Sequence, residues 1–228
     1  IVIVSGKIEP EAVFEKIKAA YGALEGGPRL ERPEFPRYSQ TSERRIEIHD
    51  ELATPRVAYG YRITPAEHPD TSALDVLAQI LFHGESSRGQ TRLVRGGSFV
   101  AFSGMGFTPT YPGLFFMTGV LRQNVSLEKA EEEIESLLRE IRARGVSEAE
   151  VKAGVRQLTV QYLDSMQTPR GLAQLVGSVE LVLGRPQKFV DELTRLRKVT
   201  PADVQRVAQQ YLDPNQRSVV VLRRKATS

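Results

Sequence analysis

Residues 98–141 read SFVAFSGMGFTPTYPGLFFMTGVLRQNVSLEKAEEEIESLLREI, and the change of pattern within this stretch decides the fold class. Residues 98–104 and 114–121 are predicted strands, because both are rich in aromatic and β-branched residues and a loop with Pro109 and Pro112 separates them. From Ser126 onward, apolar residues recur every three to four positions, which is the spacing of an amphipathic helix. Two successive strands followed by a long helix favour neighbouring, antiparallel strands over a strand–helix–strand crossover.

The same grouping continues on both sides of this stretch. Upstream, we predict strands at 45–49 and 57–63 and helices at 71–82 and 87–94. Residues 45–49 alternate between polar and apolar, which is the pattern of a half-buried strand. Downstream, we predict helices that begin near Ser147, Pro169, Pro186 and Pro201, and a closing strand at 218–222. The predicted fold class is therefore α+β, with a largely antiparallel sheet and helices packed on one face. No glycine-rich phosphate-binding motif is present.

The first 42 residues have a different organisation. Ile1–Val4 is a β-branched run that predicts a strand, and a helix is expected to open at Glu9 and Pro10. Residues 26–42 are rich in proline, glycine and charge, which is typical of a linker. A domain boundary is expected within this linker.

Composition narrows the function classes. Hydrophobic residues make up 40% and charged residues 26%, so the chain has the make-up of a folded globular protein. The net charge is only +3 and no run of five or more Lys or Arg occurs, which argues against nucleic-acid binding. No apolar run approaches the roughly 20 residues of a membrane span. Cysteine is absent, which excludes disulfides and cysteine-based metal sites. The compartment stays undecided between cytoplasm and periplasm.

No complete catalytic constellation is visible. His49, His68 and His83 are widely separated, and neither a zinc-binding helix motif nor its inverted form H-x-x-E-H occurs. The most suggestive segment is 92–104, where a cationic helix end carrying Arg92 runs directly into a predicted strand. A guanidinium group can hold a carbonyl or carboxylate, and a strand edge can accept a peptide as an added strand. Arginine at a helix end is, however, usually structural.

Several segments together carry a family resemblance. GESSR at 84–88, TRLVRGGSF at 91–99, PGLFF at 112–116 and KVTPADVQRVAQQYL at 198–212 resemble the C-terminal "inactive" half of the M16 (pitrilysin-like) metallopeptidases. This family includes bacterial zinc proteases and the subunits of mitochondrial processing peptidase. The resemblance covers essentially the whole chain, and it implies the α+β architecture of an M16 peptidase half.

The resemblance also implies a division of the chain and of the chemistry. Residues 1–27 would be the last strand and helix of the preceding N-terminal half, 28–42 the linker, and 43–228 the non-zinc domain. The family's zinc motif lies in the N-terminal half, so this chain is expected to bind no metal and to be inactive alone. Its expected partners are a zinc-bearing half or subunit and a peptide substrate, in a homo- or heterodimer.

Two site residues follow from the resemblance. In the family, an Arg and a Tyr seven residues later help to hold the peptide and the tetrahedral intermediate. These positions fall on Arg92 and Phe99. A phenyl ring cannot donate the hydrogen bond of a phenol, and loss of one such donor typically costs about 2.7–4 kcal/mol in the transition state. Phe99 therefore keeps open an alternative, in which the chain is a non-catalytic structural or interaction subunit of the same family.

Overall fold

The chain forms an α+β fold in a computed structural model that describes residues 1–28, 39–51 and 54–225. The strands are β1 (Arg44–Asp50), β2 (Arg56–Arg62), β3 (Phe99–Phe107), β4 (Leu114–Leu121) and β5 (Arg217–Arg224). The helices are α1 (Pro10–Tyr21), α2 (Thr71–Phe82), α3 (Leu127–Arg144), α4 (Glu148–Met166), α5 (Pro169–Leu183), α6 (Lys188–Leu196) and α7 (Pro201–Tyr211), with a π-helical η1 (Gly89–Arg95) and a 3-10 turn η2 (Pro214–Gln216). No described helix is both long and apolar enough to cross a lipid bilayer.

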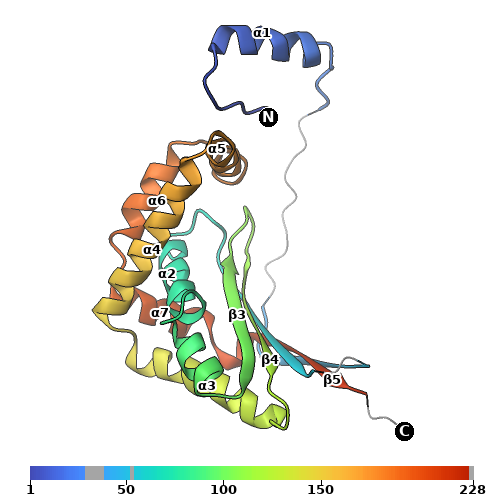
Figure 1. The fold of residues 1–228 in the computed structure, drawn as a ribbon, viewed down its shortest axis with the longest axis vertical. Helices are drawn as coiled ribbons and strands as arrows, with labels where there is room; N and C mark the ends of the chain where they lie inside the picture. The colour runs from blue at the N-terminus through green and yellow to red at the C-terminus, as the bar shows by residue number, and fades with distance from the viewer. Residues whose placement is uncertain (29–38, 52–53, 226–228) are drawn as a thin grey trace.

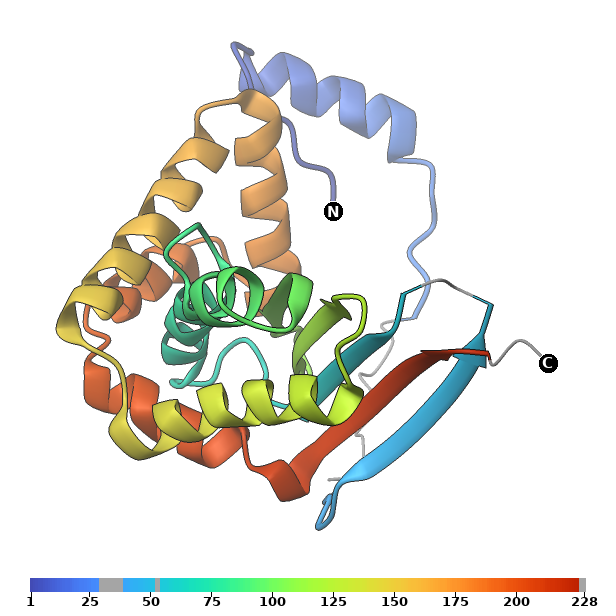
Figure 2. The ribbon, with the colours of Figure 1, turned by 60° about the horizontal axis from the view of Figure 1, so that its bottom comes forward.

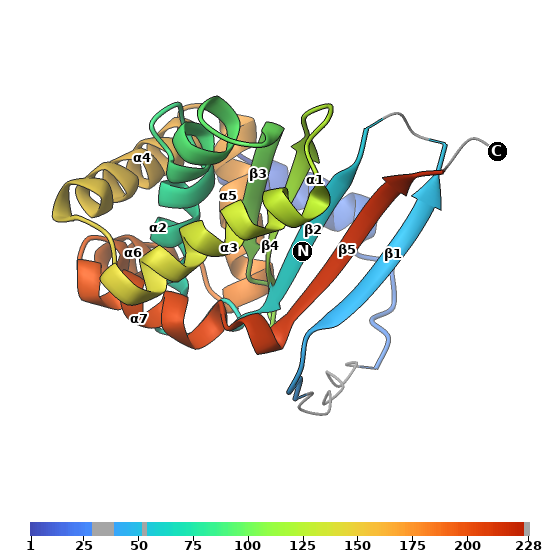
Figure 3. The same cartoon turned by 90° about the horizontal axis from the view of Figure 1, so that it is seen from below.

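The five strands form one sheet in the order β1-β5-β2-β4-β3. The β5–β2, β2–β4 and β4–β3 pairs are antiparallel, and only β1 and β5 run parallel. The predicted largely antiparallel sheet is therefore confirmed. Figure 1 shows the helix layer, led by α2, α3 and α4, on one side of the sheet, and Figure 3 shows the strands from β3 out to β1.

The core lies between this helix layer and one face of the sheet. On β2, Val57, Tyr59 and Tyr61 alternate inward and are almost fully buried, as the two-residue period of a strand requires. They meet helix residues such as Leu77 and Ile134, which are buried to the same degree. Each large apolar side chain buried in this way contributes roughly 1.5–3 kcal/mol relative to exposure.

Local signals set the helix boundaries where the sequence predicts them. Ser147 and Glu150 form the predicted capping box of α4, with the Glu150 backbone N–H donating to Ser147 Oγ at 3.2 Å. Thr200 and Asp203 do the same for α7. α3 ends at Gly145, whose φ of 72° is a conformation that a side chain would disfavour.

Two expectations about strands were wrong. Ile1–Val4 forms no strand, because nothing among the described residues pairs with its backbone. β1 was expected to be half-buried from its alternation, yet all seven of its residues are exposed. Its position explains the difference, since among the described strands β1 pairs only with β5, and it lies at the edge of the sheet beyond the helix layer (Figure 2).

Candidate functional site

The face of the sheet opposite the helices is open and carries apolar side chains. Register and the two-residue period place Ile46 of β1 beside Val220 of β5, and Phe107 of β3 beside Leu114 of β4, on this face. Ile46 and Phe107 are 61% and 59% exposed. Over β2 this face has no large side chain between Arg56 and Arg62, because Ala58 and Gly60 point to it there. Several exposed apolar side chains on one open sheet face are typical of a binding surface in soluble proteins.

The open face is bordered by a free strand edge. Within the described part of the chain, β3 pairs only with β4, so its other edge has unpaired backbone groups. Backbone groups at such an edge can pair with an extended peptide, and side-chain pockets alongside can select its residues.

Arg92 lies on η1, the short helix that leads into β3. Its side chain is 41% exposed, and its Nη1 donates to Glu140 Oε2 on α3 at 2.6 Å. This hydrogen bond is the main reason why the pKa of Glu140 lies below its usual value. The guanidinium group is thus held at the surface by one carboxylate and is still accessible to solvent.

The turn that joins η1 to β3 depends on close backbone packing. A Cβ added at Gly97 would lie 2.6 Å from the Arg92 carbonyl oxygen and 2.7 Å from Glu133 Oε2. Glu133 in turn accepts hydrogen bonds from the backbone N–H and the hydroxyl of Ser98, at 2.8 and 2.7 Å. A side chain at Gly97 would therefore separate the helix that carries Arg92 from the start of the strand.

Arg88 anchors the other end of η1. Its guanidinium group contacts Glu150 on α4 in a bidentate arrangement at 2.6 and 3.0 Å, and it also reaches Glu140 at 3.4 Å. The side chain is largely buried. This ion pair fixes η1, and with it Arg92, against the helix layer.

Phe99 is placed differently from Arg92. Its ring is 0% exposed and packs against Phe102, with 5.6 Å between ring centroids, and against Gly119. In this position the ring offers no surface to a ligand. Contact of Phe99 with a peptide stays a sequence-based prediction, and it would require the ring to move.

The described residues do not fit a zinc centre. They contain no group of three or more His, Asp or Glu side chains placed to share a metal ion. His49 lies on exposed β1, His68 in the turn before α2, and His83 at the C-terminal end of α2. Zinc chemistry would therefore have to come from residues outside this part of the chain.

The arrangement matches a known family. The family model described as "Peptidase M16 inactive domain" matches residues 1–158. The chain belongs to the M16 inactive-domain family. This match confirms the resemblance to M16 peptidases and the fold that it implies. The division into residues 1–27, 28–42 and 43–228 stays a prediction.

Relatives of this M16 domain are bacterial zinc proteases. The chain is 26% identical to "Zinc protease PqqE" of Helicobacter pylori over 98% of this chain and 51% of that protein. The crystal structure of a protease from Helicobacter pylori superimposes with a TM-score of 0.88 at 22% identity, over 96% of this chain and 54% of that one. A peptidase M16 inactive domain from Pseudomonas fluorescens gives 0.81 at 17% identity, over 98% and 52%. The chain thus spans about half the length of these relatives.

One residue of note was missed by sequence reasoning. Asp75 lies in α2, where ten of twelve residues are buried, and its carboxyl group lines a pocket. A lone carboxylate between Leu74 and Val76 in a helix of this hydrophobicity was the available signal. An apolar helix that retains one acidic residue often does so for a specific interaction.

Proposed function

We propose that this chain is the zinc-free half of an M16-type zinc metalloendopeptidase, and that it closes the peptide-binding chamber and positions the substrate. The observation that supports this proposal best is the open apolar sheet face beside the free edge of β3, with the helix layer confined to the opposite side. Such a surface suits an extended, unfolded peptide, whose backbone pairs with the edge while its apolar side chains lie on the sheet.

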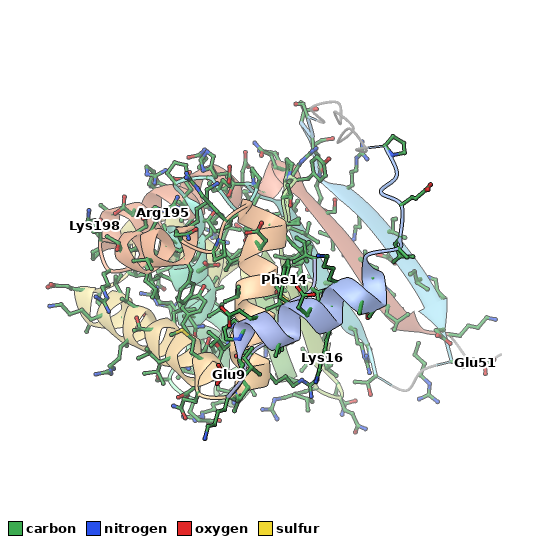
Figure 4. All side chains as sticks on the ribbon, turned by 90° about the horizontal axis from the view of Figure 1, so that it is seen from above. Glu9, Phe14, Lys16, Glu51, Arg195 and Lys198 are labelled. Carbon is green, nitrogen blue, oxygen red and sulfur yellow. The ribbon has the colours of Figure 1, made fainter. Side chains whose placement is uncertain are left out.

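The N-terminal segment supports a second half as partner. α1 has no buried residue, and Phe14 and Tyr21 on it are mostly exposed. Figure 4 looks down on α1, with Phe14 labelled, crossing the molecule in front of α5. A helix with this much exposed apolar surface is expected to pack against another protein surface. A zinc-bearing half or subunit that covers α1 would account for it and would supply the metal chemistry.

Arg92 would position the peptide. Its exposed guanidinium group can exchange the Glu140 carboxylate for a peptide carbonyl or C-terminal carboxylate without moving η1, because Arg88 still holds that helix through Glu150. A charge-assisted hydrogen bond of this kind is worth about 1.5–3 kcal/mol. The partner half would supply the zinc chemistry, and this chain would bind and orient the peptide.

One observation favours the alternative, a structural or interaction subunit. At the position of the family's tyrosine, Phe99 has no hydroxyl group and is buried. A partner half would then gain no hydrogen-bond donor from this position. In that case the chain would bind and stabilise its partner without raising the rate of cleavage.

The test is a reconstitution assay with a quenched fluorescent peptide. This chain, a zinc-bearing M16 half from the same source and their mixture are assayed separately with zinc. We expect no cleavage by this chain alone and faster cleavage by the mixture than by the zinc-bearing half alone. Arg92→Ala should lower kcat/KM of the mixture by about 10- to 100-fold.

Arg139→Ala is the matched control, because Arg139 is an exposed arginine on α3 that pairs only with the exposed Glu132. It should leave the rate unchanged. Zinc-dependent cleavage by this chain alone would overturn the division of labour. A complex that forms but cleaves no faster than the zinc-bearing half would establish the structural alternative.

A further inference from the structure

A second site candidate lies at the end of β3, away from Arg92. A pocket of about 240 Å³ opens between α2, α4, α5 and α6, and Thr108, the residue that follows β3, borders it. Its walls are mainly apolar, with Leu175, Val179 and Val182 from α5 and Phe189 from α6. Two carboxyl groups, those of Asp75 and Glu192, also line it.

Asp75 is the unusual member of this pocket. Its side chain is partly buried and lines the pocket. It forms no hydrogen bond or ion pair with any described residue. Burial raises the pKa of Asp75 to about 7, and repulsion from Glu192 adds to the effect. A partly buried carboxyl group without a partner is costly to ionise, and a cation bound in the pocket would offset this cost.

The neighbouring charges leave this one carboxyl group unmatched. Glu192 pairs with Arg195 one helical turn away, labelled in Figure 4, and Lys188, the residue before Phe189, pairs with Glu67. Tyr162 of α4 contacts Phe189 edge to face, with 5.4 Å between ring centroids. Aromatic rings near a carboxylate favour an organic cation, because the ring faces attract positive charge.

We propose that this pocket binds the side chain of a lysine residue in the peptide, with its ammonium group on Asp75 and its alkyl stem against Leu175 and Val179. The inference rests on the proposed peptide-binding function and names a residue type that the substrate would carry. A compact ammonium group suits a single carboxylate, whereas a guanidinium group prefers a bidentate partner. A metal ion is disfavoured, because only one of the two carboxylates is free and the walls are apolar.

The position of the pocket suits a peptide on the β3 edge. Thr108 joins the pocket to Phe107, the last residue of β3. A second hollow of about 390 Å³ between α4 and α5 shares Tyr162, Leu175 and Ser178 with the first. The two hollows are therefore adjacent, and a peptide chain that passes the end of β3 would have Asp75 within reach of its side chains.

Binding of lysine should depend on pH. The ammonium group competes with the proton on Asp75, so affinity should rise between pH 6 and pH 8 and binding should release a proton. The other ionisable groups facing Asp75 are Glu192 and Tyr162, with the Arg195, Lys188 and Glu67 ion pairs behind them. The pKa of Tyr162 is raised to about 12, so its phenol stays neutral across this range.

The experiment is an NMR titration of the ¹⁵N-labelled chain with four probes at pH 8. The probes are an acetylated lysine amide, its norleucine counterpart, n-pentylamine and a lysine-containing pentapeptide. We expect at least about tenfold weaker binding of the norleucine probe than of the lysine probe, with shifts at α2, α5 and α6. Asp75→Asn should abolish this preference, and Glu132→Gln, which removes an exposed carboxylate on α3, should keep it.

Calorimetry in buffers of different ionisation enthalpy adds a readout that a purely structural role would not move. Lysine binding at pH 7 should release a fraction of a proton in the wild type and none in Asp75→Asn. Equal binding of the lysine and norleucine probes, or an unchanged preference in a folded Asp75→Asn variant, would overturn the proposal. n-Pentylamine binding as tightly as the pentapeptide would assign the pocket to free amines and overturn the peptide assignment. Cleavage in the reconstituted enzyme tests the proposed function separately, because lysine binding can fail while cleavage persists.

Discussion

The ion pair between Arg88 and Glu150 should make the attachment of η1 sensitive to acid. The hydrogen bonds from Arg88 are the main cause that lowers the pKa of Glu150 from 4.5 to about 2, and the backbone and hydroxyl of Ser147 add to it. A difference of this size corresponds to roughly 3 kcal/mol of stability at neutral pH. Since the Glu150 side chain is partly exposed, we expect Glu150→Gln to cost about 2 kcal/mol at pH 7.

The pH dependence gives the sharper test. Because the pKa of Glu150 is lowered in the folded protein, its contribution is complete above pH 4.5 and is lost as the pH falls toward 2. Urea unfolding followed by circular dichroism at pH 7, 5 and 3 should therefore show the wild type and Glu150→Gln converging in acid. Glu148→Gln, whose exposed carboxylate pairs with Lys152, is the control and should change little at any pH. A Glu150→Gln deficit that stays constant from pH 7 to pH 3 would refute the electrostatic explanation.

Three further predictions concern the pocket, the core and a helix cap. Asp75→Asn should raise the unfolding free energy by on the order of 2–4 kcal/mol at pH 8 but not at pH 4. The reason is that the raised pKa of Asp75 makes the fold less stable as the pH rises through 7. Urea unfolding at both pH values measures this difference. Gly119→Ala places a methyl group 2.3 Å from the Phe99 ring and should cost about 1–3 kcal/mol. Phe99→Ala should cost about 3–5 kcal/mol, and a double variant whose loss equals the sum would contradict direct packing of the pair. Thr200→Ala should cost about 1 kcal/mol through loss of the capping box, and thermal unfolding with no change in Tm would contradict this.

Features that depend on local chemistry were predictable from the sequence. The capping boxes at Ser147 and Thr200 set the starts of α4 and α7, and β4 has the predicted bounds Leu114–Leu121. These signals act within a few residues, so the rest of the fold hardly alters them. The α+β class followed from the order of these elements.

Features that depend on distant neighbours were not predictable. The alternation of β1 indicates one buried face, but burial depends on whether a helix covers the strand, and Ile46 stays exposed beyond the helix layer. The family resemblance marks both Arg92 and Phe99 as site residues, yet only the packing of Phe99 against Gly119 shows which of the two side chains faces solvent. The pocket around Asp75 is lined by four helices, and some of its lining residues lie more than 100 positions apart in the sequence. No local motif reveals such a pocket.

The position of β5 in the sheet limits the order in which the molecule can be built. β5 ends the described chain, yet it lies between β1 and β2, and its first partner in β1 is Arg44, paired with Ser218. During synthesis β1 therefore emerges long before the neighbour that it requires, and the two cannot pair until residues 217–224 have been made. Such long-range pairing slows folding and leaves strand edges exposed in the meantime. A nascent chain that stalls before residue 217 would thus present an unpaired β1 to chaperones and to other nascent chains.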